Sequence, residues 1–234
     1  VDVHVTVNTL VKEKEIESLK EYLKQLNKIG VDALIVQDMG AVEIIKKTVP
    51  DMTLHASTQM TVTSLEGVKY LEDMGFSRVV LARELSEKEI EHICKNAKAE
   101  IEVFVHGAIC MCYSGQCLMS SILGGRSGNR GRCAQPCRLP YDLLENGKTV
   151  KSGYVLSPKD MALVNDLETL KRIGVTSLKI EGRLKRAEYV SAVVGVYRKY
   201  LDKGGNVSKK DMQELLDAFS RTGFTDGYFK GNLG

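Results

Sequence analysis

Apolar and polar residues follow each other along this chain in patterns that predict a regular series of strands and helices. Residues 3–7 alternate β-branched and polar side chains, which is typical of a strand, whereas residues 14–26 carry Leu and Ile at helical spacing. Residues 33–36 form a short, continuously apolar run, as in a strand buried on both faces. The same reasoning predicts further strands at 52–56, 78–82, 100–105 and 177–180, and further helices at 41–47, 64–74, 86–96, 187–202 and 208–219, with a short helix after Pro158.

One local unit recurs in the sequence: the end of a helix, a glycine, a short loop and a buried strand. Gly30, Gly75 and Gly174 occupy the position at which a helix commonly ends in a left-handed residue. Repeated βα units with short loops predict an α/β fold with a parallel sheet, which is either doubly wound or closed into a barrel.

A polar or charged residue follows each predicted strand. In a barrel the active site lies at the carboxyl ends of the strands. Polarity there is partly automatic, since a buried run must meet water somewhere, but the side chains could also line one pocket that accepts anions. Lys179, a charged residue inside an apolar strand, favours the pocket because an unpaired buried charge is costly. The residues concerned are Asn8, Asp38, His55 with Ser57 and Gln59, Arg83 with Glu84, His106, and Glu181 with Arg183.

Composition narrows the class of protein. The 234 residues are 43% hydrophobic and 27% charged, which is ordinary for a globular protein and argues against disorder. No apolar stretch approaches the roughly 18 residues of a membrane span, and no signal peptide opens the chain, so the reducing cytosol is the expected compartment. The net charge of +3 is compatible with an anionic partner such as RNA without requiring one.

The cysteines carry the strongest chemical signal. Cys110, Cys117, Cys133 and Cys137 form the pattern C-x6-C-x15-C-x3-C in a Gly-rich and Arg-rich segment. In a reducing compartment, clustered cysteines favour metal binding or catalysis over disulfides. Zinc ribbons prefer two close C-x2-C pairs, so this wide spacing suits an iron–sulfur cluster better. The thiolate charge could be offset by nearby arginines: Arg126, Arg130, Arg132 and Arg138.

Other interpretations of these residues remain open. His106 and Cys110 could form the Cys–His pair of a thiol hydrolase, although no third, orienting group is evident. A structural zinc ion is a weaker alternative, and unrelated thiols are weaker still. Cys94 lies on an amphipathic helix and is expected in the core, whereas Cys112 is either a spare thiol or a substitute ligand.

Several motifs together resemble the peptidase U32 family, also called collagenase-like peptidases. The resemblance covers essentially the whole chain and is most specific in the cysteine segment. The matching motifs are EVFVHGAIC (102–110), GQCLMS (115–120), NRGRCAQPCR (129–138), VNTL (7–10), HASTQM (55–60), VLAREL (80–85) and SLKIEGR (177–183).

The resemblance implies a function that the family name does not state. Similar family members hydroxylate RNA bases (a tRNA wobble uridine or a ribosomal RNA cytidine) or the ubiquinone ring, with an iron–sulfur cluster and without molecular oxygen. The RNA-modifying members depend on prephenate, which Arg83, Lys179 or Arg183 could hold here. The alternative is the peptidase of the family name, using Cys/His or a metal.

The resemblance also supplies candidate site residues. It implies a 4Fe-4S cluster on Cys110, Cys117, Cys133 and Cys137, of which the fourth ligand is drawn from different places in different members. The candidate catalytic residues are His106, Lys179 and Glu181. The candidate substrate-binding residues are Asn8, His55, Gln59, Arg83, Arg130 and Arg183.

A TIM-type (β/α) barrel is the fold implied by the resemblance. Residues 1–205 would supply six of its eight βα units, with the Cys-rich segment 106–142 inserted. Residues 206–234 would form a C-terminal helix and a linker toward a further domain. An incomplete barrel has an open sheet edge, which is expected to be either exposed or paired with a second copy. RNA is the expected partner, and no membrane is expected.

Overall fold

The computed structural model describes residues 1–231 and shows two compact units, each described here by itself. Unit 1 comprises residues 1–82, 97–100 and 112–136. Unit 2 comprises residues 83–96, 101–111 and 137–234. Residues 232–234, the last three of the predicted C-terminal segment 206–234, lie outside the described part.

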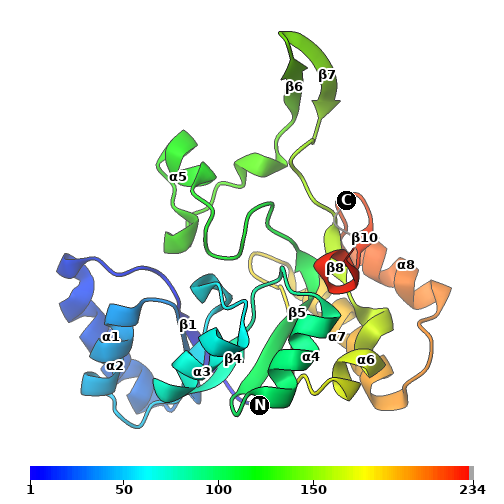
Figure 1. Ribbon diagram of the computed structural model, residues 1–234. Helices are drawn as coiled ribbons and strands as arrows, with labels where there is room; N and C mark the ends of the chain where they lie inside the picture. Colours follow the sequence, from blue (N-terminus) through cyan, green and yellow to red (C-terminus); the bar gives the residue numbers. More distant parts are fainter. Residues whose placement is uncertain (232–234) are drawn as a thin grey trace. The chain divides into compact units, whose positions relative to one another are not determined.

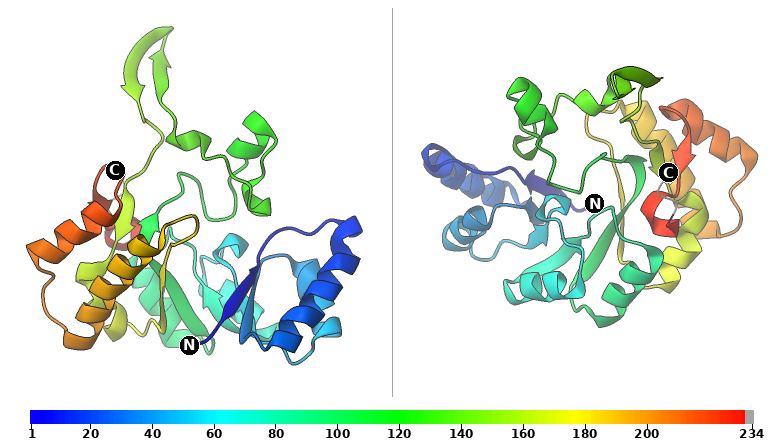
Figure 2. Two further views of the ribbon diagram at one scale, coloured as in Figure 1. Left: turned by 180° about the vertical axis from the view of Figure 1, so that it is seen from behind. Right: turned by 45° about the horizontal axis from the view of Figure 1, so that its top comes forward.

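Unit 1 is an α/β structure in which helices alternate with the strands of a parallel sheet. The strands lie side by side in the order in which they occur in the sequence. A doubly wound sheet reverses its strand order at a switch point, and these strands show no reversal. The helices between them cover one face of the sheet (Figures 1 and 2). The elements are β1 (His4–Val7), α1 (Ile16–Ile29), β2 (Ala33–Val36), α2 (Met39–Thr48), β3 (Leu54–Ala56), α3 (Leu65–Asp73), β4 (Phe76–Val80) and α5 (Met119–Gly124).

Local chemistry explains why these elements form where they do. The apolar stripe of α1 buries Leu19, Leu23 and Leu26 against the sheet, and the helix ends at Gly30 in the left-handed region with φ of 77°. All residues of β2 are buried, as its continuous apolar run predicts. The hydroxyl of Ser64 caps α3 by accepting a hydrogen bond from the Gly67 N–H at 3.2 Å.

Unit 2 is built around the long strand β5. Along one stretch β5 pairs in parallel with β9, and at its carboxyl end it pairs antiparallel with β8, which in turn pairs in parallel with β10. The register against β9 shifts between Phe104 and His106, which makes a β-bulge beside His106. The elements are α4 (Glu87–Asn96), β5 (Glu100–Ala108, whose first residue belongs to unit 1), β6 (Tyr141–Glu145), β7 (Lys148–Gly153), β8 (Asp160–Ala162), α6 (Leu167–Arg172), β9 (Ser177–Ile180), α7 (Ala187–Lys203), α8 (Lys209–Ala218) and β10 (Phe224–Thr225).

The structure adds elements that the sequence did not predict. The short helix expected after Pro158 is confirmed as α6, which begins at Leu167, and the unpredicted strand β8 comes before it. The Cys-rich segment 106–142, in which no helix or strand was predicted beyond His106, contains α5 and the start of the β6–β7 hairpin. The hairpin turns at Asn146–Gly147, both with positive φ, and extends away from the rest of unit 2 (Figures 1 and 2).

Among residues 1–231, no helix combines the length and apolar character needed to span a membrane.

Candidate functional site

In unit 1, the polar residues that follow the strands form a hydrogen-bonded group. The Asn8 side-chain amide donates to the Ser57 hydroxyl at 3.2 Å. The Gln37 amide donates to the backbone carbonyls of Asn8 at 2.7 Å and of Asn129 at 3.1 Å. Carboxyl ends of parallel strands share one edge of a sheet, which explains why residues so distant in sequence meet here. Gln37, which the sequence prediction passed over for Asp38, is the residue that joins this edge to the Cys-rich segment.

Arg130 forms a second connection between the Cys-rich segment and the rest of unit 1. Its guanidinium makes a two-pronged ion pair with Glu15, at 2.8 and 2.6 Å, and donates to the Leu10 carbonyl at 2.5 Å. The hydrogen bond from Arg130 lowers the pKa of Glu15 to about 2. Arg130 was predicted to bind substrate. In the structure its guanidinium also has a structural role, because it holds the residues near Cys133 against the chain that follows β1.

The stretch just before Cys117 is held against the end of β3. The Thr61 hydroxyl donates to the Ser114 carbonyl at 2.6 Å and accepts from the Gln116 amide at 2.8 Å. Between these bonds, Gly115 has φ of 75° and lies so close to Gln59 that a Cβ atom would come within 2.3 Å of the Gln59 carbonyl oxygen. The side-chain Oε1 of Gln59 is buried without a hydrogen-bond partner among the described residues. The close approach of residue 115 to the Gln59 backbone therefore requires glycine.

Gly115→Ala should release this stretch. The clash with the Gln59 backbone adds to the cost of a left-handed alanine, so we expect a loss of about 2–3 kcal/mol of stability. We also expect faster hydrogen exchange at residues 112–117, measured by mass spectrometry. Gly125→Ala is the matched control, because Gly125 has φ of 63° and open space around its Cα. Equal exchange in the two variants would show that only backbone strain matters.

The remaining predicted residue of unit 1, His55, is buried and packs edge-on against His4 with ring centroids 4.7 Å apart. It lies on β3, before the strand end that carries Ser57. The structure thus brings together Asn8 and Ser57 directly and places Gln59 beside Gly115.

In unit 2, Arg83 and Glu181 form an ion pair at 3.3 Å. The guanidinium also stacks over the Phe104 ring, 3.7 Å from its centroid. Burial lowers the pKa of Arg83, while the charges of Glu181 and Cys110 act in the opposite direction. Arg183 joins this group through its backbone N–H, which donates to Glu181 at 3.0 Å. A half-buried arginine paired with a carboxylate is suited to exchange that partner for a carboxylate of a substrate.

His106 lies at the bulge of β5 with 1% of its surface exposed. Its Nδ1 is 3.3 Å from the Tyr197 hydroxyl, and that hydroxyl donates to the Val105 carbonyl at 2.8 Å. Because the Tyr197 proton is committed, the hydrogen bond assigns a proton to Nδ1 and leaves the lone pair on Nε2. Nε2 is buried and has no partner within residues 1–231.

The charge state of His106 follows from its surroundings. The ring packs against Tyr197 and Phe224, and burial lowers its pKa to about 4, against the opposing charge of Asp160. Lys185 lowers the pKa further. His106 is therefore neutral near pH 7 and can accept a proton there but cannot donate one as an imidazolium.

Lys179, the charged residue inside an apolar strand, has a partner. Its ammonium lies 2.8 Å from Glu102 on the neighbouring strand β5, and Glu102 also accepts from the Ser177 hydroxyl at 2.8 Å. Glu102, which the sequence prediction did not select, shows only 9% of its side chain. The pair explains how the sheet tolerates the lysine.

The sequence prediction did not select Asp160 and Arg221, but it did name Arg138 near the cysteines. Asp160 begins β8 with 1% exposure and forms an ion pair with Arg221. Because β8 runs antiparallel to β5, its first residue lies at the carboxyl end of β5, beside Ala108. Asp160 is the first residue of its strand, so a prediction based only on residues that follow strands does not select it. Arg138 donates to the Ile109 carbonyl at 2.5 Å and to the Ser157 hydroxyl at 2.8 Å, which holds the residue before Cys110.

The six cysteines of the chain are half-buried and form no disulfide. Of the four predicted ligands, Cys117 and Cys133 belong to unit 1, and Cys110 and Cys137 belong to unit 2. Neither unit, over its described residues, holds three or more His, Cys, Asp or Glu side chains grouped so as to bind a metal ion. Cys94, expected in the core, is half-buried on α4, and burial raises the pKa of its thiol to about 11.

The sequence of this chain is similar to proteins with two kinds of name, RNA hydroxylation protein and collagenase. A family model described as peptidase family U32 matches residues 1–234. The chain is 45% identical over 86% of its length to "23S rRNA 5-hydroxycytidine C2501 synthase" of Escherichia coli (strain K12), and covers 30% of that protein. It is 36% identical over 99% of its length to "tRNA hydroxylation protein P1" of Bacillus subtilis (strain 168), and covers 58% of that protein. It is also 30% identical over 97% of its length to "Collagenase" of Porphyromonas gingivalis (strain ATCC BAA-308 / W83), of which it covers 59%. The chain thus spans less than two thirds of each of these relatives.

Proposed function

Because the chain belongs to peptidase family U32, we propose that it takes part in the oxygen-independent hydroxylation of a base in tRNA or ribosomal RNA. The observation that carries this choice over a peptidase is the state of His106. Nδ1 is hydrogen-bonded to Tyr197, and the buried Nε2 has no partner, sulfur included, in the described part of the chain. A Cys–His protease needs the imidazole to engage its thiol. The names of relatives that hydroxylate tRNA and 23S rRNA point the same way.

The proposal includes an iron–sulfur cluster held by Cys110, Cys117, Cys133 and Cys137, and rests on their spacing and on the family resemblance. Their chemistry fits such a group, because none of the four is in a disulfide and cysteine thiolates are the usual ligands. When bound, a cluster would supply one-electron chemistry. Arg83 and Arg138 carry positive charge that acts on Cys110 and would stabilise its thiolate form.

Roles for the other residues follow from their contacts. Arg83 and Arg183 would bind the carboxylates of a co-substrate such as prephenate, with Glu181 orienting Arg83. Lys179 is engaged by Glu102, so we assign it to holding β9 against β5. His106 would accept a proton through Nε2. Asn8 and Gln59 would contact the RNA from the strand ends of unit 1, whereas His55 is buried on β3 and would act by packing behind them.

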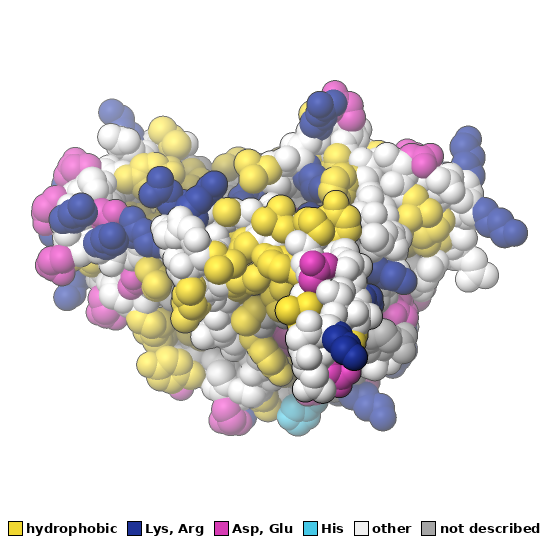
Figure 3. All heavy atoms as spheres, turned by 90° about the horizontal axis from the view of Figure 1, so that it is seen from above, with side chains coloured by type: hydrophobic (Ala, Val, Ile, Leu, Met, Phe, Trp, Pro, Cys, Tyr) yellow, Lys and Arg dark blue, Asp and Glu magenta, His cyan; other side chains and the backbone are white. Residues whose placement is uncertain are grey.

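The proposed setting is a (β/α) barrel acting on RNA in the cytoplasm. The consecutive strand order of unit 1 supports the barrel. Pairing of two copies through a sheet edge remains a prediction. On the face drawn in Figure 3, basic side chains stand singly or in small groups among acidic ones, so RNA binding would depend on local sites and not on one continuous basic surface.

Cys133→Ala should abolish both the cofactor and the reaction. The protein purified without oxygen should be brown, contain iron and sulfide, and convert RNA to a product whose hydroxylated nucleoside is detected by mass spectrometry. The variant should lose the colour, the iron and the product, because a thiolate ligand is removed.

Cys94→Ala is the matched control and should retain all three, since Cys94 is a weakly acidic thiol on α4. A colourless wild-type protein with one tightly bound zinc ion would contradict the proposed iron–sulfur cluster. Hydrolysis of gelatin by the wild type that disappears in Cys110→Ala would establish the peptidase instead.

A further inference from the structure

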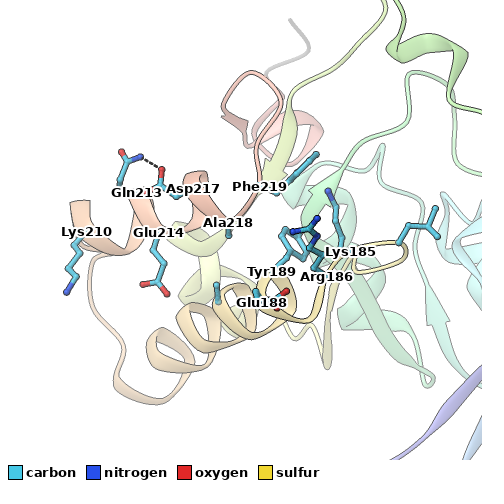
Figure 4. A pocket seen from close by; sticks show the side chains of 12 residues that line it. Lys185, Arg186, Glu188, Tyr189, Lys210, Gln213, Glu214, Asp217, Ala218 and Phe219 are labelled. Carbon is cyan, nitrogen blue, oxygen red and sulfur yellow. Dashed lines mark hydrogen bonds between the residues drawn. The ribbon is translucent and has the colours of Figure 1, made fainter.

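A groove with a volume of about 1050 Å³ lies within unit 2, between the first turns of α7 and a face of α8 that runs from Lys210 to Ala218. Figure 4 shows Lys185 and Arg186 next to each other at one end of it, with Tyr189 and Phe219 close by. None of these residues belongs to the group around Arg83 and Glu181.

This end of the groove is positively charged. The Lys185 ammonium lies 2.8 Å from the centroid of the Phe219 ring, which holds it in place. Arg186 stands at the N-cap of the 17-residue helix α7 and makes no capping hydrogen bond with its side chain. The first N–H groups of a helix lack backbone partners and carry partial positive charge, which adds to the two cations.

Tyr189 provides a neutral donor at the same place. Only 5% of the residue is exposed, and it lines the groove. Burial raises its pKa to about 12, so the hydroxyl keeps its proton under ordinary conditions. A tyrosine hydroxyl that lines a groove can donate a hydrogen bond to a ligand there.

The rest of the groove limits what can bind. Glu214 and Asp217 on α8 and Glu188 on α7 also line it, and Asp217 accepts a hydrogen bond from Gln213 at 2.7 Å. These carboxylates would repel a run of phosphates along the groove. Two cations, a helix N-terminus and a hydroxyl at one end suit a single phosphate.

The loop between β9 and α7 connects this end of the groove to the candidate catalytic group. Lys185 follows Glu181 by four positions along the chain, so their Cα atoms are at most about 14 Å apart. Between them, Leu184 is 87% exposed and has φ of 62°, a strained conformation for a leucine. Strained, exposed residues of this kind are frequent at ligand-binding loops.

We propose that Lys185, Arg186 and Tyr189 bind one backbone phosphate of the RNA strand, beside the nucleotide that reaches Glu181. The inference rests on the proposed function and specifies how its substrate is held. The ammonium and guanidinium contact the phosphate oxygens, the Tyr189 hydroxyl donates to one of them, and the exposed Leu184 covers the neighbouring sugar or base.

Binding of a fluorescent single-stranded RNA, followed by anisotropy across a range of salt concentrations, tests the proposal. Lys185→Gln should weaken binding about tenfold and reduce the slope of log affinity against log salt by about 0.7, the value for one phosphate contact on a single strand. Tyr189→Phe should weaken binding about threefold and leave the slope unchanged, because it removes a neutral donor.

Lys203→Gln is the matched control. It makes the same charge change at the exposed carboxyl end of the same helix, and its affinity should stay within about twofold of wild type. Lys185→Gln and Tyr189→Phe variants that fold normally by circular dichroism and bind RNA as Lys203→Gln does would overturn the proposal. So would Lys185-dependent binding of inorganic phosphate, measured by calorimetry, together with unchanged RNA affinity.

The outcomes separate this inference from the proposed function. Wild-type protein that hydroxylates RNA and binds it independently of Lys185 and Tyr189 leaves the function standing and removes the phosphate site. Wild-type protein with no affinity for RNA removes both.

Discussion

Replacing Arg221 with Met should lower the free energy of unfolding by about 3–5 kcal/mol. Asp160 is almost fully buried, and its carboxylate accepts hydrogen bonds from the Arg221 guanidinium and, at 3.0 Å, from the Arg221 backbone N–H. Removing the guanidinium leaves a buried carboxylate without its cation, which costs more than the pair contributes when intact. Urea unfolding followed by circular dichroism, with an unchanged m-value, measures the loss.

Two variants control this prediction. Asp160→Asn added to Arg221→Met should recover part of the stability, because the uncompensated charge disappears. Arg198→Met breaks a pair with Asp202 in which both side chains are more than half exposed, and should change stability by less than about 0.5 kcal/mol. Equal losses in Arg221→Met and Arg198→Met would mean that burial of Asp160 does not matter.

Acidification should destabilise the protein through His106. The pKa of His106 is about 4 in the folded protein and about 6.5 when unfolded, so the unfolded chain binds a proton first. The stability is therefore fully present above pH 6.5 and is lost as the pH falls toward 4. The loss is about 1.4 kcal/mol per pH unit, and about 3 kcal/mol in total. Urea titrations at pH 7, 6 and 5 measure it.

His106→Gln tests the assignment through the slope and not through the absolute stability, because the substitution also changes packing. The slope between pH 7 and 5 should become much shallower in the variant. Glu15, whose folded pKa is about 2, loses its stabilising contribution only below about pH 4.5, so it does not disturb this window. A slope that does not change would show that another group takes up the proton.

Hydrophobic periodicity predicted most of the regular elements because it reflects burial directly. The run at residues 33–36 became β2 without adjustment, and the predicted helix at 187–202 became α7, Ala187–Lys203. The predicted strand at 78–82 lies two residues earlier as β4, because the buried Phe76 opens it after a shorter loop than expected. Gly30, Gly75 and Gly174 all have positive φ, as their positions after helices predicted.

The missed elements are those whose stability comes from tertiary pairing. β8 is too short to show a pattern, and it forms because Met161 and its neighbours pair with the end of β5. The hairpin did carry a local signal, Asn146–Gly147 between residues suited to strands, but its exposed side chains hide the alternation.

The candidate site divides in the same way. Strand ends predicted Arg83, His106 and Glu181, since parallel strands bring their carboxyl ends to one edge. Ion-pair partners such as Glu102 depend on which strands become neighbours, and a single sequence does not contain that information. The unpartnered nitrogen of His106 and the contact of Gly115 with Gln59 are likewise products of packing.

The pairing of Ala108 with Asp160 makes everything between them, residues 109–159, a single closed loop as far as the sheet of unit 2 is concerned. Loop-closure entropy grows only with the logarithm of length, at about 0.6 kcal/mol for each doubling. Chain inserted at the exposed hairpin tip therefore adds little cost and leaves the β5–β8 pairing unchanged. Asn146–Gly147 is the point at which this protein can accept a new binding segment, or a tag for attachment, without a change to its folded core.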